Sequence, residues 1–166
     1  MKTESGELLE QTTHALTTSP IQLDLTARVN ASPETVFDFA ADHNRLPEWA
    51  PGVRSVEVDN SDAEQPGEVG AVRYLSGAFG KPDKEVVRAF DRPRLLAISN
   101  SDESLHGMFT DHIGIIVFES EGDGTRLGLR ICAVPGRNPI ARFIGKRLLP
   151  IMMGRARRNL QQHFTA

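Results

Sequence analysis

The stretch that decides the fold is PIARFIGKRLLPIMMGRARRNLQQHF, which runs from Pro139 to Phe164 near the end of a 166-residue sequence. It predicts one long helix. Asn138 suits the N-cap because its side chain can accept hydrogen bonds from the first helical N–H groups, and Pro139 suits the first helical position. A helix with a strongly apolar side is not stable alone in water, so other elements must cover it.

The apolar residues of this helix form two sets, separated by a proline. Residues of the first set recur every three or four positions and predict a buried face made of Ile140, Phe143, Ile144, Leu148 and Ile151. Pro150 cannot donate a hydrogen bond to the carbonyl of Lys146, so a kink is expected there. The second set points in a different direction and consists of Met152, Met153, Ala156, Leu160 and Phe164.

The chain before this helix reads mostly as β-strands. Residues 21–30 alternate strictly between apolar and polar side chains, which predicts a strand with one buried face. Ser32 and Pro33 then start a short helix, and Asp42 can cap a second one. Six further strands are predicted over residues 53–59, 69–78, 84–91, 94–100, 107–119 and 125–133.

The short connections between these strands indicate an antiparallel sheet. We therefore predict an α+β fold in which a curved, seven-stranded antiparallel sheet wraps around the long C-terminal helix. The two short helices after the first strand are expected to close one end of the curve. We assign residues 21–166 to a single domain and residues 1–20, which are rich in Thr, Ser, Glu and Gln, to a tail or docking arm.

The composition indicates a folded globular protein in a reducing compartment. Hydrophobic residues make up 39% of the chain and charged residues 25%, and a single cysteine, Cys132, cannot form an internal disulfide. The sequence contains no stretch of 18 apolar residues and shows no secretory signal pattern. These features lead us to expect a cytoplasmic protein.

Charge is distributed unevenly along the chain. The net charge is −3, yet all 22 acidic residues precede position 124 and nine of the 19 basic residues follow it. The basic residues can face solvent or an acidic surface of the same domain. Alternatively, they can attract the C-terminal helix weakly to an anionic membrane. Nucleic acid is not expected as a partner, because the overall charge is negative.

Short motifs occur at positions that fit this architecture. They are ASPETVF (31–37), LPEWAPGV (46–53), PGEVGA (66–71), DRPRL (91–95), and FE followed by GDGTRL (118–119 and 122–127). Together they resemble the SRPBCC superfamily, the helix-grip fold of START-related lipid-transfer domains, polyketide cyclase/dehydrases and the birch pollen allergen. The resemblance spans roughly Ile21 to Phe164. It implies a container that holds an apolar ligand between sheet and helix, but these turn and core motifs specify no function.

Small residues at inward positions, Ala27, Gly114 and Ala133, leave room for such a ligand or fit a tightly packed core. Trp49 can contact the ligand or cover one end of the fold as a structural residue. The residues expected to line the container are Trp49, Tyr74, Met108, Thr110, His112, Ile116, Phe118, Ile144, Leu148 and Met152.

His112 and Tyr74 are the candidate polar groups. On the strand 107–119, the charged residues Asp111 and Glu119 share one face, so His112 is assigned to the other, inner face. It can orient a ligand, act as a general acid or base, or be a core histidine satisfied by its surroundings. Tyr74 is placed inward because its neighbour Arg73 is assigned to solvent.

Three functions remain open at this point. The first is binding or transport of a hydrophobic small molecule, such as a lipid, an isoprenoid or a polyketide. The second is a cyclase/dehydrase-like enzyme that uses His112 and Tyr74 on a polyketide-like substrate. The third is a protein-interaction domain. No metal or cofactor is expected, because the five histidines lack metal-ligand spacing and no phosphate-binding glycine motif occurs. The oligomeric state is left open.

Overall fold

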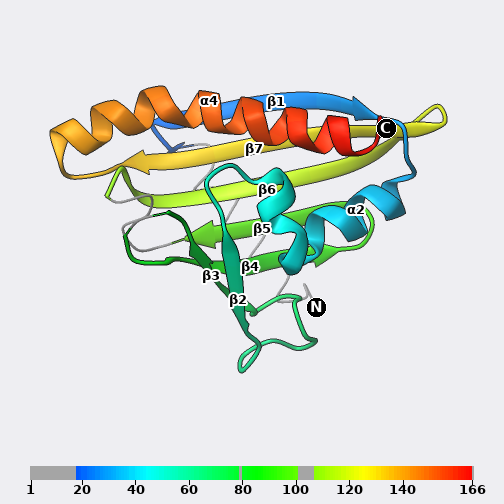
Figure 1. Cartoon of the computed structure of the whole chain (residues 1–166), viewed down its shortest axis with the longest axis horizontal. Helices are drawn as coiled ribbons and strands as arrows, with labels where there is room; N and C mark the ends of the chain where they lie inside the picture. The colour runs from blue at the N-terminus through cyan, green and yellow to red at the C-terminus, as the bar shows by residue number, and fades with distance from the viewer. Residues whose placement is uncertain (1–17, 79, 101–106, 166) are drawn as a thin grey trace.

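The structure is a computed structural model that describes residues 18–78, 80–100 and 107–165. It contains one seven-stranded antiparallel sheet in the order β1-β7-β6-β5-β4-β3-β2, with a long helix, α4, running along it (Figure 1). The strands are β1 (Ile21–Val29), β2 (Ser55–Asp59), β3 (Val72–Ser76), β4 (Asp83–Asp91), β5 (Leu95–Asn100), β6 (Phe109–Glu121) and β7 (Gly124–Pro135). The predicted α+β helix-grip fold is confirmed. Most of the predicted tail, residues 1–17, and the predicted loop 101–105 lie outside the described residues.

The first strand of the chain pairs with the last one and forms one edge of the sheet. Strand β1 pairs with β7 along its whole length, from Ile21 opposite Ala133 to Val29 opposite Thr125. Its apolar side chains face inward and its polar ones face solvent, as the alternation predicts. A tight turn at Gly122 connects β6 to β7, and its φ of +64° is a conformation that glycine adopts without steric cost.

The short helices after β1 are also confirmed. Helix α2 (Pro33–Ala41) begins after Ser32, whose Oγ accepts a hydrogen bond from the Thr35 N–H at 3.3 Å. A 3-10 turn, η1 (His43–Arg45), and the short helix α3 (Leu46–Trp49) follow. The Asn159 side chain donates a hydrogen bond to the Trp49 carbonyl at 3.2 Å, which ties α3 to α4.

Helix α4 (Pro139–His163) matches the predicted helix closely at both ends. The Asn138 side chain accepts hydrogen bonds from the N–H groups of Ile140 at 2.9 Å and Ala141 at 3.1 Å, as expected of an N-cap. Pro150 is exposed and lies inside a helix that continues to His163. The helix therefore tolerates the missing N–H donor at this position.

The buried face of the first half of α4 differs from the predicted one. Leu148 is half-buried, and the other four predicted members, Ile140, Phe143, Ile144 and Ile151, are exposed. The buried residues of the helix are instead Gly145, Leu149, Ala156 and Leu160. Gly145 explains the difference, because a Cβ atom there would lie 2.8 Å from Met108 Cβ and 3.1 Å from Phe109 Cζ. The helix approaches β6 at Gly145, where there is no side chain. The prediction used only the spacing of large apolar residues and therefore missed this contact.

Two apolar clusters lie on the inner face of the sheet, the face covered by α2 and α4. The larger is centred on Phe37, whose ring packs edge-on against Phe90 at 5.0 Å and Phe118 at 5.1 Å. The smaller lies under the first half of α4 and contains Phe109, Ala133 and Leu149. No helix among the described residues is long and apolar enough to cross a membrane.

Candidate ligand site on the inner face of the sheet

Polar side chains from four neighbouring strands form one row across the inner face of the sheet. Arg73 in β3 pairs with Glu85 in β4, and Asn100 in β5 pairs with His112 in β6. The β4–β5 register, Val86 opposite Ser99, brings the two pairs side by side. Glu85 lies two residues before buried Val87 and His112 four before buried Ile116, so their side chains point to the same side as the apolar core.

Three of these side chains contact one another. The Arg73 guanidinium forms an ion pair with the Glu85 carboxylate. On the other side of the carboxylate, His112 Nε2 lies 3.4 Å from Glu85 Oε1. The exposed fractions of the Arg73, Glu85 and His112 side chains are only 3%, 14% and 15%. We call these three residues the inner polar cluster.

Electrostatics keep Glu85 ionised. Burial alone would raise the pKa of the carboxyl, but the charge of Arg73 and the hydrogen bond from His112 outweigh it and lower the pKa to about 2. The cluster therefore holds a permanent carboxylate beside a permanent guanidinium at neutral pH. Among the described residues, the buried Nε of Arg73 has no hydrogen-bond acceptor. A buried donor without an acceptor is costly, and a ligand oxygen would satisfy it.

Apolar residues beside the cluster are only partly covered. Gly114 in β6, Ile131 in β7 and Leu23 in β1 lie in the next row of the inner face, where Gly114 pairs with Ile131 and Ile131 with Leu23. All three are half-buried, whereas the inner-face residues Leu127 and Phe118 at the far end are buried. The sheet therefore presents apolar surface of intermediate exposure next to the inner polar cluster.

The inner face contains part of the predicted lining. His112, Ile116 and Phe118 point inward as predicted, and Trp49 is buried in α3. Ile116, Phe118 and Trp49 all belong to the larger apolar cluster. Met108 and Met152 are half-buried, and Met108 packs against the smaller cluster.

Tyr74 does not lie on the inner face, so its predicted position was wrong. Arg73, its neighbour in β3, is buried against Glu85, and strand alternation turns Tyr74 to the opposite face, where it pairs with Lys84. The error came from assigning a charged residue to solvent by default. Arg73 and Glu85 were missed for the same reason. The sequence did contain a signal for their burial: Arg73 is two residues from the apolar Leu75 and Glu85 two residues from the apolar Val87, so each shares a strand face with an apolar residue.

A β-bulge interrupts the alternation of β6 at Thr110. Phe109 pairs with Pro135 and Asp111 with Val134, so β6 contains one extra residue at Thr110. The bulge lets Phe109 point inward and become buried, whereas Thr110 is half-buried. Ile144 is a further correction: it is exposed on α4.

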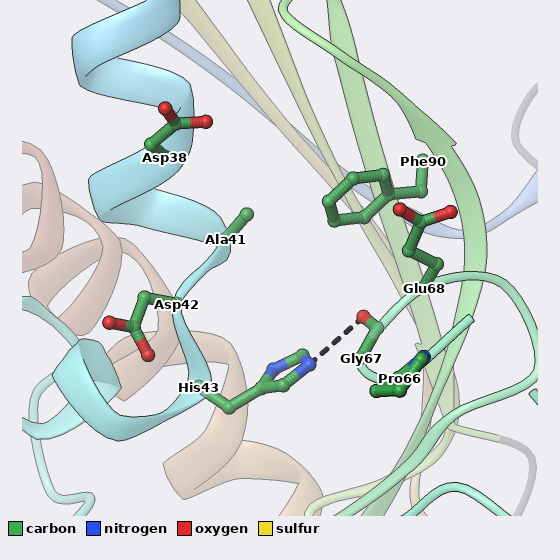
Figure 2. A pocket seen from close by; sticks show the side chains of 8 residues that line it. All are labelled: Asp38, Ala41, Asp42, His43, Pro66, Gly67, Glu68 and Phe90. Carbon is green, nitrogen blue, oxygen red and sulfur yellow. Dashed lines mark hydrogen bonds between the residues drawn. The ribbon is translucent and has the colours of Figure 1, made fainter.

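A separate surface pocket lies between the end of α2 and the loop before β3 (Figure 2). His43 and the backbone of Gly67 are joined across it by a hydrogen bond of 2.9 Å between Nε2 and the carbonyl oxygen. Burial lowers the pKa of His43, and the nearby charge of Arg73 lowers it further. Both effects favour the neutral ring, and the hydrogen bond to Gly67 ties the loop to η1. The pocket is lined by Asp38, Ala41, Asp42, His43, Pro66, Gly67, Glu68 and Phe90.

The described residues contain no group of three or more His, Cys, Asp or Glu side chains that could hold a metal ion. The inner polar cluster offers a ligand three chemical groups: a guanidinium, a carboxylate and an imidazole. The guanidinium and the imidazole can donate hydrogen bonds to a ligand, the carboxylate can only accept them, and the imidazole can also exchange a proton.

The fold and this site define an α+β helix-grip protein with a polar cluster on the inner wall of its sheet. Residues 20–165 match the family described as polyketide cyclase / dehydrase and lipid transport. The chain belongs to this family, as the sequence motifs indicated. No curated protein matches the chain.

Solved structures with the same fold share little sequence with this chain. The protein XoxI from Bacillus cereus has a TM-score of 0.69 at 18% identity, over 87% of this chain and 95% of its own. Ara h 8.0201 has a TM-score of 0.64 at 14% identity, over 87% and 97%. The di-domain ARO/CYC StfQ from the steffimycin biosynthetic pathway has a TM-score of 0.68 at 13% identity, over 98% of this chain and 55% of its own. At these identities the similarity establishes the fold.

Proposed function

We propose that this protein binds a hydrophobic small molecule between the inner face of the sheet and α4, with one polar group of the ligand at the inner polar cluster. The observation that carries the proposal is the buried Arg73 Nε, which has no acceptor among the described residues. On the same face of the sheet, Gly114, Ile131 and Leu23 remain half-buried. Apolar surface with a small number of convergent polar groups is the usual composition of a small-molecule site.

The charges of the cluster restrict the ligand's polar group. Glu85 already balances the charge of Arg73, so a second carboxylate would be repelled by Glu85. A neutral oxygen, as in a ketone, ester or hydroxyl group, can accept from Arg73 Nε without that repulsion. The favoured ligand class is therefore an apolar molecule with a neutral hydrogen-bonding oxygen, and lipids, isoprenoids and polyketides all include such molecules.

The first experiment is to purify the full chain and identify co-extracted organic molecules by mass spectrometry. Binding is then measured with two fluorescent probes, the ketone laurdan and the hydrocarbon diphenylhexatriene. We expect both to bind, and the double variant Arg73→Met/Glu85→Leu to weaken laurdan about tenfold with little effect on the hydrocarbon. Replacing both charges keeps the core free of an unpaired ion, so the variant should fold.

The outcomes separate the two parts of the proposal. If neither probe binds and no organic molecule co-purifies, the ligand-binding function is wrong. If both probes bind and the double variant has the same affinity for each of them as the wild type, the cluster does not recognise the ligand's oxygen.

A cyclase-like enzyme is the second candidate function. It is favoured by the 3.4 Å approach of His112 to an ionised Glu85, because a carboxylate can orient an imidazole that exchanges protons with a substrate. Two solved structures of the same fold, StfQ and BexL, are ARO/CYC proteins of biosynthetic pathways. Tyr74 has no part in this version, since it lies on the outer face.

This candidate is tested by incubating the protein with a linear polyketide-like substrate and following product formation by mass spectrometry. Product formation that His112→Phe abolishes while the variant still binds laurdan would establish catalysis. Binding without turnover would leave the carrier function as the explanation.

A further inference from the structure

The outward side of the first half of α4 is apolar and uncovered. Among the described residues, the exposed large hydrophobic side chains are all on this helix: Ile140 at 71% exposure, Phe143 at 61%, Ile144 at 48% and Ile151 at 53%. Positions 140, 144 and 151 fall on one side of a helix, with 143 beside them, and the buried Gly145 and Leu149 lie on the opposite side. This set of four residues is here called the outer apolar stripe.

Positive charge surrounds the outer apolar stripe. No acidic residue occurs in α4 or in the turn before it. The exposed basic residues of this region are Arg137, Arg142, Lys146, Arg147, Arg155 and Arg158. Within the part of the chain that the structure describes, none of them forms an ion pair.

Two exposed arginines of β7 are paired with acids instead. Arg126 pairs with Glu119 and Arg130 with Asp24, so these surface charges are already compensated by neighbours. On α4, by contrast, the Arg147 guanidinium stacks over the Phe143 ring at 4.7 Å from its centroid. A cation is thus held at the edge of the apolar stripe with no acid beside it among the described residues. Such an arrangement suits a surface that is apolar inside and anionic outside.

We propose that the first half of α4 docks on an anionic phospholipid bilayer. Ile140, Phe143, Ile144 and Ile151 enter the boundary between headgroups and acyl chains, while the basic residues contact lipid phosphates. Long basic side chains can keep their charge at the headgroups while their stems cover apolar surface. The docking is independent of the proposed ligand and would hold if that function failed.

Other occupants fit the surface less well. A second copy of the chain would place two strongly basic helices against each other, and like charges at close range repel. Nucleic acid would satisfy the charges but leave four large apolar side chains without a partner. An anionic bilayer satisfies both the charge and the apolar stripe.

The position of the helix links docking to the inner face of the sheet. The opposite side of the same helix turn places Leu149 against Phe109 and Ala133, close to the β6–β7 end of the polar row. A helix held by lipid on its outer side and by the sheet on its inner side lies between the two. Docking would therefore bring the inner face of the sheet close to the bilayer.

The test is co-sedimentation of the full chain with vesicles of phosphatidylcholine alone and of phosphatidylcholine mixed with phosphatidylserine. We expect binding to the mixed vesicles that weakens as salt is added, and little binding to phosphatidylcholine alone. Phe143→Ser/Ile144→Ser should reduce the affinity about tenfold or more, because both side chains are exposed and their loss removes only inserted apolar surface.

Matched charge variants complete the test. Arg142→Gln/Lys146→Gln/Arg147→Gln should abolish the preference for phosphatidylserine. Arg94→Gln/Arg126→Gln/Arg130→Gln, which removes the same charge from paired arginines outside α4, should leave binding within about twofold. Circular dichroism checks that all variants remain folded.

Several outcomes would overturn the proposal. These are equal affinity for both kinds of vesicle, wild-type binding by the Phe143→Ser/Ile144→Ser variant, and equal losses from the two charge variants. A concentration-dependent dimer in analytical ultracentrifugation that Phe143→Ser/Ile144→Ser dissociates would assign the stripe to a second copy of the chain instead.

Discussion

His112 and Glu85 meet on the inner face of the sheet, with Nε2 of one 3.4 Å from Oε1 of the other, although a whole strand, β5, separates the strands that carry them. Arg73 approaches the same carboxylate from the next strand, β3. The three side chains form a buried polar cluster in a face that is otherwise mainly apolar. Burial of charge on the inner wall of the sheet gives the cluster consequences for stability that can be measured.

Replacing Glu85 with Ala should destabilise the protein by about 3–5 kcal/mol, because the buried Arg73 charge would lose its partner. The free energy of unfolding is measured by urea denaturation at neutral pH. Glu119→Ala is the matched control, since it removes an exposed ion pair with Arg126 and should have little effect. Equal stability of the Glu85→Ala and Glu119→Ala proteins would contradict burial of the Arg73–Glu85 pair.

Acid should unfold the protein through Glu85. Its pKa is about 2 in the folded state against an ordinary value of 4.5, so the unfolded chain takes up this proton first as the pH falls. The stabilisation, about 3 kcal/mol, is fully present above pH 4.5 and is lost between about 4.5 and 2. Urea denaturation across this range should show a smaller loss of stability in Glu85→Gln than in the wild type. Parallel curves for the two proteins would refute the assignment to Glu85.

His43 should titrate below its ordinary pKa of 6.5, because burial and the charge of Arg73 both disfavour the imidazolium. A lowered pKa stabilises the fold above pH 6.5, and that contribution is lost as the pH falls through the folded-state pKa. Nuclear magnetic resonance titration of the His43 ring measures the value directly. In His43→Asn, stability should depend less on pH below 6.5. A ring that titrates at or above 6.5 would exclude this explanation.

Gly145→Ala should destabilise the protein despite the better helix propensity of alanine. The added Cβ would lie 2.8 Å from Met108 Cβ, a position that cannot move without displacing the backbone of the chain before β6. Gly154→Ala is the matched control on the same helix, because nothing outside the nearby backbone of the helix lies within 4 Å of its added Cβ. That change should stabilise the protein by about 0.5–1 kcal/mol. Thermal denaturation of both variants measures the difference, and stabilisation by both would mean that α4 does not approach β6 so closely.

Ligand binding should distinguish the two faces of the sheet. His112→Gln should weaken laurdan binding several-fold, because it alters a partner of Glu85 inside the cluster. Tyr74→Phe should leave binding unchanged, because the Tyr74 side chain is on the outer face. Fluorescence titration measures both affinities. A stronger effect of Tyr74→Phe would place the ligand on the outer face of the sheet.

Much of the fold was predictable from local patterns in the sequence. Alternation along residues 21–30, the Ser32 cap of α2 and the Asn138 cap of α4 depend on neighbouring residues alone, and all three were confirmed. The inward face of β6 from His112 to Phe118 was also correct, because Asp111 and Glu119 both face solvent. Strand periodicity and helix caps are short-range properties, so the sequence itself determines them.

The tertiary structure decided which of several plausible faces became buried. The first half of α4 has apolar residues on both sides, and the close approach allowed by Gly145 selected the side that packs on β6. The extra residue at Thr110 shifted the alternation of β6, and its effect appears only in the register with β7. Neither choice is encoded by a local pattern, since each depends on the shape of a distant segment.

The tertiary structure also determined which residues form the inner polar cluster. By its sequence neighbours, Arg73 is a charged strand residue that ordinarily faces water, and Tyr74 the better candidate for burial. In the structure, Glu85 from the adjacent strand supplies the opposite charge that makes burial of Arg73 tolerable, and Tyr74 is turned outward as a consequence. The cost of burying a charge depends on its partner, and that partner is brought within reach only when the strands pair.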